Sequence, residues 1–342
     1  MERLRNLNAG LGQYCLQLGR ALAATPAPQV WHFECYTPIY LTGILGASFG
    51  YKATKNWHKL TGVATDATLW HCMHQDSSYF PMSDKTAVAM TIHDLNFLER
   101  IDYPNWRKKL KIRQLQRKIN RCKGLVYISE YVKNAVHTNL DVPNTIAEQV
   151  IYNGVNVEET ADSEQETGNT PYLFSIGLHP KKNYAVALPI LKSNPAYQWI
   201  IAGADDKGYQ AELEKIATKL GVSGQLKFIG TVTEQEKWRL YKNCSALLFP
   251  SLSEGFGLPV LEAMAFGKPV FLSDKTSLPE IGGKEAYYFK DLAPEHVHKV
   301  FADGMTDFKN DPEKPTRLKN HAAKFTWENA ARDYLQFYNN II

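Results

Sequence analysis

Two glutamates lie eight positions apart in the stretch SLSEGFGLPVLEAMAFGKPV, which runs from Ser251 to Val270. The seven residues between Glu254 and Glu262 are glycine, proline or apolar. Proline suits the first turn of a helix because its φ is already helical, so a helix is predicted to begin near Leu258. Glu262 would then lie in the first turn and Glu254 in the loop before it. Free NH groups at a helix start favour an anion, so the stretch predicts a phosphate held between two carboxylates.

Strand and helix patterns alternate on both sides of the polar run Glu158 to Pro171, which is predicted to be a linker. The predicted strands lie at 31–38, 67–74, 86–95, 124–130, 147–154, 172–178, 197–203, 225–230, 245–251, 268–274 and 286–290. A capping box at Thr233 and Glu236 predicts the start of a further helix. The alternation predicts two doubly wound α/β domains, with ligand at the carboxyl ends of the strands.

Length and composition fit a folded two-domain protein. The chain has 342 residues, of which 44% are hydrophobic and 22% charged. No segment is apolar over the length of a membrane span, and the N-terminus has no apolar signal region. Five cysteines without a CxxC pair favour reduced thiols over a disulfide framework or a zinc site: Cys15, Cys35, Cys72, Cys122 and Cys244. We therefore expect a cytoplasmic protein, attached at most to a membrane surface.

Positive charge is concentrated in the first half of the chain. Residues 1–160 carry 18 Lys and Arg against 13 Asp and Glu, whereas residues 161–342 carry 21 against 22. The segment from Arg107 to Lys123 is the centre of this charge and predicts docking on an anionic membrane or on a phosphate-bearing lipid acceptor. Its apolar residues are expected to form one buried stripe: Trp106, Leu110, Ile112, Leu115 and Ile119. A solvated surface helix is the alternative, and nucleic acid is not expected because no base-reading motif accompanies the charge.

Several motifs together resemble one enzyme family. The E-x7-E arrangement of Glu254 and Glu262 is similar to the signature of the retaining glycosyltransferases of family 4, which have the GT-B fold. SIGLHPKKN, 175–183, resembles the donor-phosphate loop of that family, and KFIGTVTEQEKWRLYKNCSALLFPS resembles its nucleotide-base strand and the following helix. TIHDLNFLE, LVYISEYVKNAV and VIYNGVN resemble the N-terminal domain of the subgroup that includes many bacterial mannosyltransferases. The resemblance extends over most of the chain and implies two Rossmann-like domains facing across a cleft.

The resemblance implies a role for each motif in binding a nucleotide-diphosphate sugar. Lys181 and Lys182 would meet the diphosphate, on which negative charge develops as it leaves. Glu262 would accept hydrogen bonds from the ribose, and Glu254 would contact the donor sugar, which makes Glu254 and Lys182 candidate catalytic residues. Backbone NH groups at the start of the helix would add dipoles to the phosphate site: Gly255, Phe256, Gly257 and Leu258. Backbone recognition of the base would fall at Gly230, Thr231 and Val232.

In the first domain, Gly10, Leu11 and Gly12 resemble the glycine loop that faces the diphosphate and acceptor, with an ordinary turn as the alternative. The resemblance also implies that His93 hydrogen-bonds the donor sugar, with a structural histidine as the alternative. The family needs no metal and no further cofactor. One departure from the family is Leu178, at a position where several relatives place an arginine on the phosphates.

The resemblance divides the chain into three parts. Residues 1–160 would form the acceptor-side domain, residues 161–320 the nucleotide-sugar domain, and residues 321–342 a helix that packs back on the first domain. The family normally begins with a β-strand that leads into the glycine loop, whereas MERLRNLNAG reaches Gly10 at once. We therefore expect the first strand of the N-terminal sheet to be missing, with an upstream start as the favoured reason.

The function expected from the sequence is retaining transfer of a hexose-type sugar from a GDP- or UDP-sugar to a glycan or lipid-linked acceptor, in surface polysaccharide or lipopolysaccharide assembly. Another nucleotide-sugar enzyme of the same fold is one alternative, such as an epimerase or a phosphorylase. A non-catalytic binding or partner subunit is the other alternative.

Overall fold

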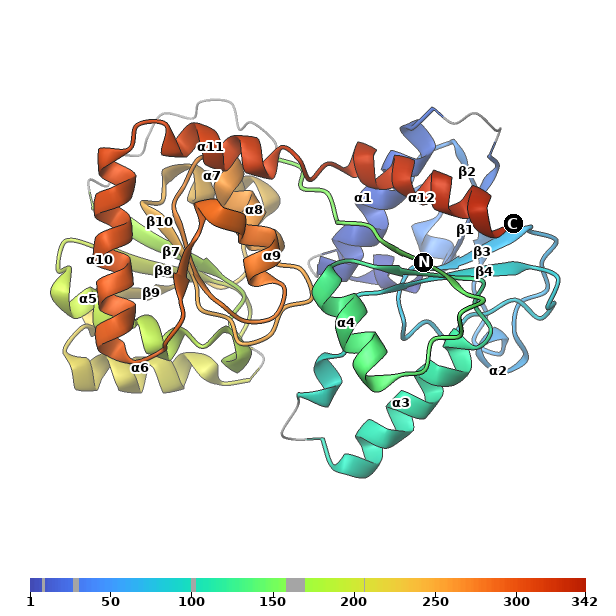
Figure 1. Ribbon diagram of the computed structural model, residues 1–342, viewed down its shortest axis with the longest axis horizontal. Helices are drawn as coiled ribbons and strands as arrows, with labels where there is room; N and C mark the ends of the chain where they lie inside the picture. The colour runs from blue at the N-terminus through green and yellow to red at the C-terminus, as the bar shows by residue number, and fades with distance from the viewer. Residues whose placement is uncertain (8–9, 27–30, 100–102, 158–169, 206) are drawn as a thin grey trace. The chain divides into compact units, whose positions relative to one another are not determined.

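The computed structural model describes residues 1–7, 10–26, 31–99, 103–157, 170–205 and 207–342. The chain forms two compact units (Figure 1). Unit 1 consists of Met1–Gly154 and Thr326–Ile342, and unit 2 consists of Val155–Phe325. Both units contain parallel sheets with helices, which confirms the predicted α/β class. Most of the predicted linker, residues 158–169, lies outside the described residues.

Unit 1 contains two parallel sheets among the residues that are described. One has four strands in the order β3 (Leu69–Cys72), β4 (Ala87–Ile92), β5 (Gly124–Tyr127) and β6 (Ala147–Val150). The other pairs β1 (Phe33–Thr37) with β2 (Phe49–Ala53), a strand that the sequence analysis did not predict. The helices are α1 (Gly10–Ala24), α2 (His58–Thr61), α3 (Asn105–Ile119), α4 (Glu130–Asn139) and α12 (Trp327–Ile341). A cavity of about 500 Å³ is lined by residues of β1, β2 and β3.

The C-terminal helix α12 belongs to unit 1, where it lies beside α1 (Figure 1). Its buried face carries a polar network as well as apolar side chains. The hydroxyl of Tyr334 lies 2.7 Å from that of Tyr14 on α1 and 2.9 Å from Oγ1 of Thr91 on β4. The hydroxyl of Tyr338 lies 2.7 Å from Nδ1 of His71 on β3. Because buried polar groups need partners, this network fixes one placement of α12 on the sheet.

Unit 2 is built on one six-stranded parallel sheet in the order β12-β11-β10-β7-β8-β9. The strands are β7 (Tyr172–Ile176), β8 (Gln198–Ala202), β9 (Leu226–Phe228), β10 (Ala246–Phe249), β11 (Val270–Ser273) and β12 (Tyr287–Phe289). The helices are α5 (Pro189–Ser193), α6 (Tyr209–Leu220), α7 (Glu234–Asn243), α8 (Leu258–Ala265), α9 (Leu278–Gly282), α10 (Pro294–Asn310) and α11 (Lys314–Ala322). Every residue of β10 and β11 is buried, as expected for central strands covered on both faces. The predicted capping box of Thr233 and Glu236 is present at the start of α7.

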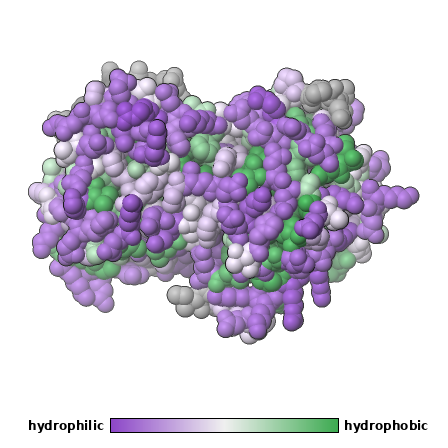
Figure 2. Space-filling view, in the orientation of Figure 1, coloured by the Kyte–Doolittle hydropathy of each residue, from purple (hydrophilic) through white to green (hydrophobic). Residues whose placement is uncertain are grey.

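The surface is hydrophilic over much of the face in view, with hydrophobic residues dispersed between charged ones (Figure 2). All five cysteines are buried free thiols. Among the described residues, no helix combines the length and the apolar character that crossing a membrane requires.

Candidate functional site

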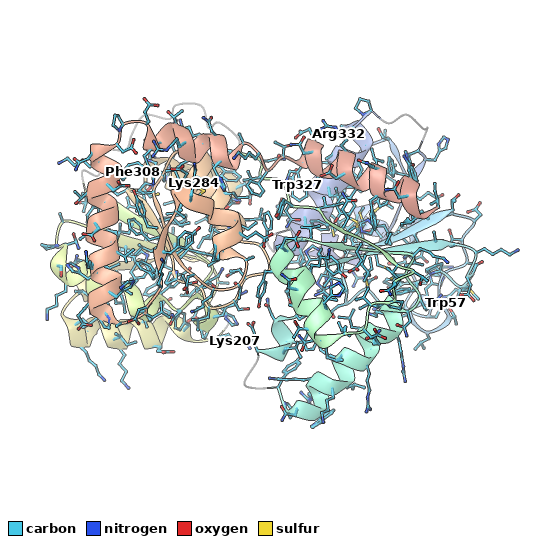
Figure 3. All side chains as sticks on the ribbon, in the orientation of Figure 1. Trp57, Lys207, Lys284, Phe308, Trp327 and Arg332 are labelled. Carbon is cyan, nitrogen blue, oxygen red and sulfur yellow. The ribbon has the colours of Figure 1, made fainter. Side chains whose placement is uncertain are left out.

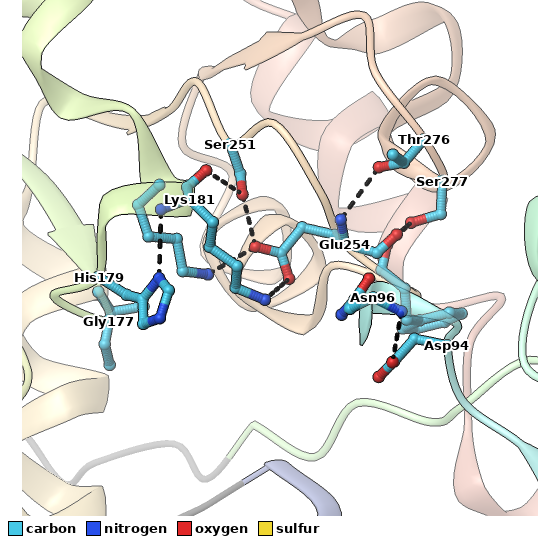
Figure 4. Close-up of polar contacts among 12 residues, drawn as sticks. Asp94, Asn96, Gly177, His179, Lys181, Ser251, Glu254, Thr276 and Ser277 are labelled. Atoms are coloured by element: carbon cyan, nitrogen blue, oxygen red, sulfur yellow. Dashed lines mark hydrogen bonds and ion pairs between the residues drawn. The ribbon is translucent and has the colours of Figure 1, made fainter. Parts of the chain in front are cut away.

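Glu254 is the centre of a buried charged cluster in unit 2 (Figure 4). It lies in the loop between β10 and α8, and its side chain is 12% exposed. Its Oε1 accepts hydrogen bonds from Nζ of Lys182 and Oγ of Ser251, each at 2.7 Å. Nζ of Lys181 lies 3.8 Å from its Oε2. The two lysines and the glutamate that the sequence singled out therefore meet at one point.

The cluster changes the charge behaviour of its members. Burial alone would raise the pKa of Glu254, but Lys182 and Lys181, with the hydroxyl of Ser251, hold it below its usual range. Burial lowers the pKa of Lys182, and the attraction of Glu254 offsets this only in part. Glu254 is thus a carboxylate at neutral pH, and Lys182 gives up its proton more readily than an exposed lysine.

Local backbone geometry brings Lys182 to the cluster. The residues Pro180–Lys182 form a short 3-10 turn that Nδ1 of His179 caps by accepting from the backbone NH of Lys181. Gly177 precedes the turn with φ +88°, and a Cβ there would lie 3.0 Å from Cε of Lys182. Glycine is therefore required both by the backbone angle and by the path of the lysine side chain.

Two residues that the sequence analysis did not select hold the loop of Glu254. Oγ1 of Thr276 accepts a hydrogen bond from the backbone NH of Glu254 at 3.1 Å. Oγ of Ser277 donates to the carbonyls of Glu254 and Phe256, at 3.0 and 2.8 Å. Gly257 follows with φ +113° and leads into α8. Both hydroxyl residues come after β11, so a neighbouring strand end fixes the shape of the glycine loop.

Glu262 lies in a second cluster on α8. The predicted start of this helix at Leu258 is confirmed, although Glu262 is its fifth residue and so lies in the second turn. Its Oε1 is 3.0 Å from Nζ of Lys237, and its Oε2 accepts from the hydroxyl of Tyr241 at 2.8 Å. Burial would lower the pKa of Lys237, but Glu262 and Glu234 together raise it. Lys237 and Tyr241 were missed because their i, i+4 spacing on α7 is also that of an ordinary helix face.

The proposed base-recognition residues follow β9 in an exposed loop. Gly230 has φ +69°, and its carbonyl accepts a hydrogen bond from the backbone NH of Gly203. Thr231 is exposed and Val232 is partly buried. This arrangement leaves a backbone turn at the carboxyl end of the sheet, where recognition would depend on main-chain groups.

His93 follows β4 and is buried in unit 1. Its Nε2 lies 2.9 Å from the carbonyl of Met73, and its backbone NH donates to Oε1 of Gln75 at 3.0 Å. Burial lowers its pKa to about 4, so the ring is neutral at physiological pH. The Tyr14 ring meets it edge-on, with 4.4 Å between ring centroids. His93 therefore has structural partners, and a contact with the donor sugar stays a prediction.

The glycine loop predicted at Gly10, Leu11 and Gly12 is wrong as a loop, because these residues form the first turn of α1. A Cβ at Gly12 would lie 2.0 Å from the carbonyl oxygen of Asn6, so the close approach of the preceding backbone accounts for this glycine.

The expected stripe on α3 is only partly correct. Leu115 and Ile119 are buried and Ile112 is partly buried, whereas Trp106 and Leu110 are exposed.

The described residues contain no group of three or more His, Cys, Asp or Glu side chains that could hold a metal ion. The donor set of the candidate site is instead cationic, with lysines and backbone NH groups. Such a set suits the phosphates of a nucleotide.

Two family models match the chain in succession. The model described as Glycosyltransferase Family 4 matches residues 9–159, and the model described as Glycosyl transferases group 1 matches residues 156–325. The chain belongs to the family 4 glycosyltransferases. The two models overlap at residues 156–159, whereas the first part of unit 1 ends at Gly154. The glutamates and lysines described above all lie within the second model.

Similar proteins of this glycosyltransferase family include bacterial mannosyltransferases. The serotype-specific mannosyltransferase WbdA of Escherichia coli is 27% identical over 225 residues, which are 63% of this chain and 27% of WbdA. The O-antigen chain mannosyltransferase RfbU of Salmonella typhimurium is 28% identical over 246 residues, covering 70% of this chain and 66% of RfbU. The chain thus spans about a quarter of WbdA and about two thirds of RfbU.

Solved structures show the same GT-B fold for this glycosyltransferase chain. Anabaena HepE in complex with UDP and glucose has a TM-score of 0.73 at 14% identity, covering 97% of this chain and 96% of HepE. Sucrose-phosphate synthase from Thermosynechococcus elongatus has a TM-score of 0.72 at 16% identity, covering 97% of this chain and 93% of that one.

Proposed function

We propose that this chain is a retaining, metal-independent glycosyltransferase that uses a GDP- or UDP-sugar. It would transfer a hexose-type sugar to a glycan or lipid-linked acceptor in the assembly of a surface polysaccharide. The observation that carries the proposal is the buried Glu254 carboxylate, which shares Lys182 and Lys181 as cationic partners within unit 2. Mannosyltransferase relatives support the substrate class.

The lysines would receive the diphosphate of the donor. An ammonium group has three donor protons, and Glu254 takes one of those on Lys182. The Phe249 ring lies beneath the same ammonium, 4.2 Å from ring centroid to Nζ. Negative charge would grow on the leaving oxygen of the diphosphate during the reaction, so its attraction to the two lysines would become stronger. This stronger attraction would stabilise the transition state more than the ground state.

The two glutamates would bind different parts of the donor. Glu254 would face the sugar, where its negative charge stabilises the positive character that develops at the anomeric carbon. Glu262 would accept from the ribose hydroxyls, with Lys237 and Tyr241 fixing the carboxylate in place. No side-chain nucleophile is required, because the leaving phosphate would take the proton of the acceptor hydroxyl on the same face of the sugar.

Attachment to the cytoplasmic side of a membrane is part of the proposal, since the basic helix α3 carries exposed Trp106 and Leu110. A thermal-shift panel with UDP, GDP, ADP and their sugars tests donor use. A ligand present at about 100 times its Kd stabilises by about 2.7 kcal/mol. A shift with one base class, followed by release of sugar from that donor, supports the proposal. A shift without turnover supports the alternative of a non-catalytic binding subunit.

A further inference from the structure

Thr276 has a backbone conformation that a β-branched residue rarely adopts. Its φ is +55°, and among the described residues only Asn183 shares a positive φ without being glycine. Asparagine tolerates this region, whereas the branched side chain of threonine is crowded there. Asn183 directly follows Lys182, and Thr276 bonds to Glu254, so both positions border the charged cluster of the candidate site. Backbone strain collects at functional sites, and the strain at Thr276 therefore points to a role there.

The strain lies in a tight turn between β11 and α9. The backbone NH of Leu278 donates to the carbonyl of Lys275 at 3.2 Å, and Ser277 has φ −78° and ψ −10°. A positive φ followed by these values is the pattern of a type II′ turn, in which the first central residue is normally glycine. Threonine occupies that position here, so this chain carries a side chain where the backbone favours none.

Buried segments on both sides hold the turn in this shape. Every residue of β11 is buried, and α9 buries Leu278, Ile281 and Gly282. Lys284, which Figure 3 labels, lies just beyond the end of α9. Strained backbone persists where its surroundings leave it no alternative, so this turn cannot relax without moving the strand or the helix.

The turn brings two consecutive hydroxyl groups to one residue, Glu254 (Figure 4). Oγ1 of Thr276 accepts from the backbone NH of Glu254 at 3.1 Å, and Oγ of Ser277 donates to its carbonyl at 3.0 Å. Consecutive side chains of an extended segment point to opposite faces, so the turn is what lets both hydroxyls reach the same residue. The main chain of Glu254 is thus held at its NH and at its carbonyl.

The side chain of Glu254 is held separately, at its carboxylate, by Ser251 and Lys182. Because the residue is fixed at both ends, its side chain has few rotamers to choose from. Loss of the Thr276 contact would free the NH end and let the carboxylate shift relative to Lys182. A displacement of about 1 Å in an active site can lower turnover by about a hundredfold.

We propose that Thr276 is a positioning residue that aims the Glu254 carboxylate at the donor sugar, and that the strain in its turn is maintained for this contact. The inference rests on the proposed function, since it concerns the same site. In this role Thr276 acts through Glu254 and need not touch the substrate. The side-chain oxygen of Thr276 carries the role, and its methyl group does not.

Three substitutions in the full chain separate the oxygen from the strain. T276S keeps both, T276A keeps the strain and removes the oxygen, and T276G removes both. With GDP-mannose or UDP-glucose as donor, kcat should stay within about twofold of wild type in T276S and fall about tenfold in T276A and T276G. The Kd of GDP or UDP should change less than about twofold in all three. The Tm of T276G should exceed that of T276A by about 2–4 °C, because glycine adopts a positive φ without strain.

The double variant T276A/E254Q tests whether Thr276 acts through the charge of Glu254. Its kcat should lie within about twofold of that of E254Q alone, because there is no carboxylate left to position. The matched control T306A removes a threonine hydroxyl on α10 that donates to the carbonyl of Ala302. It lies outside the site and should leave kcat and Kd unchanged.

A kcat of T276S as low as that of T276A would overturn the role of the oxygen, and equal Tm values for T276A and T276G would overturn the strain. Losses that multiply in T276A/E254Q would make Thr276 a structural residue only and would also overturn the proposal. If wild type cleaves neither donor, the proposed function fails, and amide hydrogen exchange at Glu254 decides the contact. Slow exchange in wild type and T276S, with faster exchange in T276A and T276G, would support it, whereas equal exchange in all four proteins would overturn it.

Discussion

Replacement of Glu254 by glutamine keeps the shape of the side chain and removes its charge. The amide oxygen can still accept from Nζ of Lys182 and Oγ of Ser251, which both lie 2.7 Å from Oε1 of the glutamate. Breaking a buried ion pair completely costs about 3–5 kcal/mol. Because E254Q retains both acceptor contacts, we expect the smaller loss of a charge-assisted hydrogen bond, about 1.5–3 kcal/mol in the free energy of unfolding.

The same substitution should lower turnover more than donor affinity. If the charge of Glu254 faces the sugar in the transition state, a loss of about 1.5–3 kcal/mol there lowers kcat by about tenfold to a hundredfold. The Kd of the nucleoside diphosphate should stay unchanged or become tighter, since the diphosphate no longer competes with a carboxylate for Lys182 and Lys181. Binding and turnover should therefore move independently.

Urea unfolding, calorimetric titration with nucleotide and steady-state turnover measure these effects. The matched control is E234Q, because Glu234 also pairs with a lysine of unit 2, with 2.8 Å from its Oε2 to Nζ of Lys237, but is half exposed. An exposed pair contributes about 0–1 kcal/mol, so E234Q should change stability little. If E254Q matches E234Q in both stability and kcat, the reasoning about Glu254 is wrong.

Three further predictions concern the same unit. Burial lowers the pKa of Lys182, so as pH rises this lysine should lose its charge, and the donor its affinity, at a pH below the usual lysine pKa of about 10.4. K182R should move this loss of affinity to higher pH. If the Kd of K182R follows the same pH dependence as that of wild type, the assignment is wrong. Y241F removes the hydroxyl bonded to Glu262 and should raise the Kd of the nucleoside diphosphate about tenfold at constant kcat, whereas a loss of kcat alone would refute the ribose-side role. G177A and G208A both place alanine at positive φ and should each cost about 1–2 kcal/mol of stability. Only G177A would crowd Lys182, so it should weaken nucleotide binding more than G208A does. Equal nucleotide affinities in the two variants would contradict the packing argument.

The sequence predicted the features that depend on short local patterns. The positions of the predicted strands, the start of α8 at Leu258 and the capping box of Thr233 and Glu236 follow from apolar runs, proline and capping chemistry. The strand ends were predicted less well, because each observed strand is shorter than its predicted range. The meeting of Lys182 with Glu254 could be expected once both were assigned to strand ends of one parallel sheet.

Other features depend on tertiary contacts that no local pattern contains. Tyr241 acquires its role only through the position of α8 against α7, where it meets Glu262. Glycine is typical of loops, but Gly12 lies in the helix α1. Glycine is needed there because the backbone of Asn6 approaches too closely for a Cβ. The strand β2 was missed because FGYKA is short, contains glycine and has exposed positions, so its apolar pattern is weak.

The most direct test of the proposed function is proton NMR of donor cleavage by the purified full chain, with GDP-mannose and UDP-glucose supplied separately. Wild type should release the sugar from at least one donor with its anomeric configuration retained, and E254Q should do so at least about tenfold more slowly while binding the same nucleotide. Cleavage with inverted configuration, or equal cleavage by wild type and E254Q, would contradict the account.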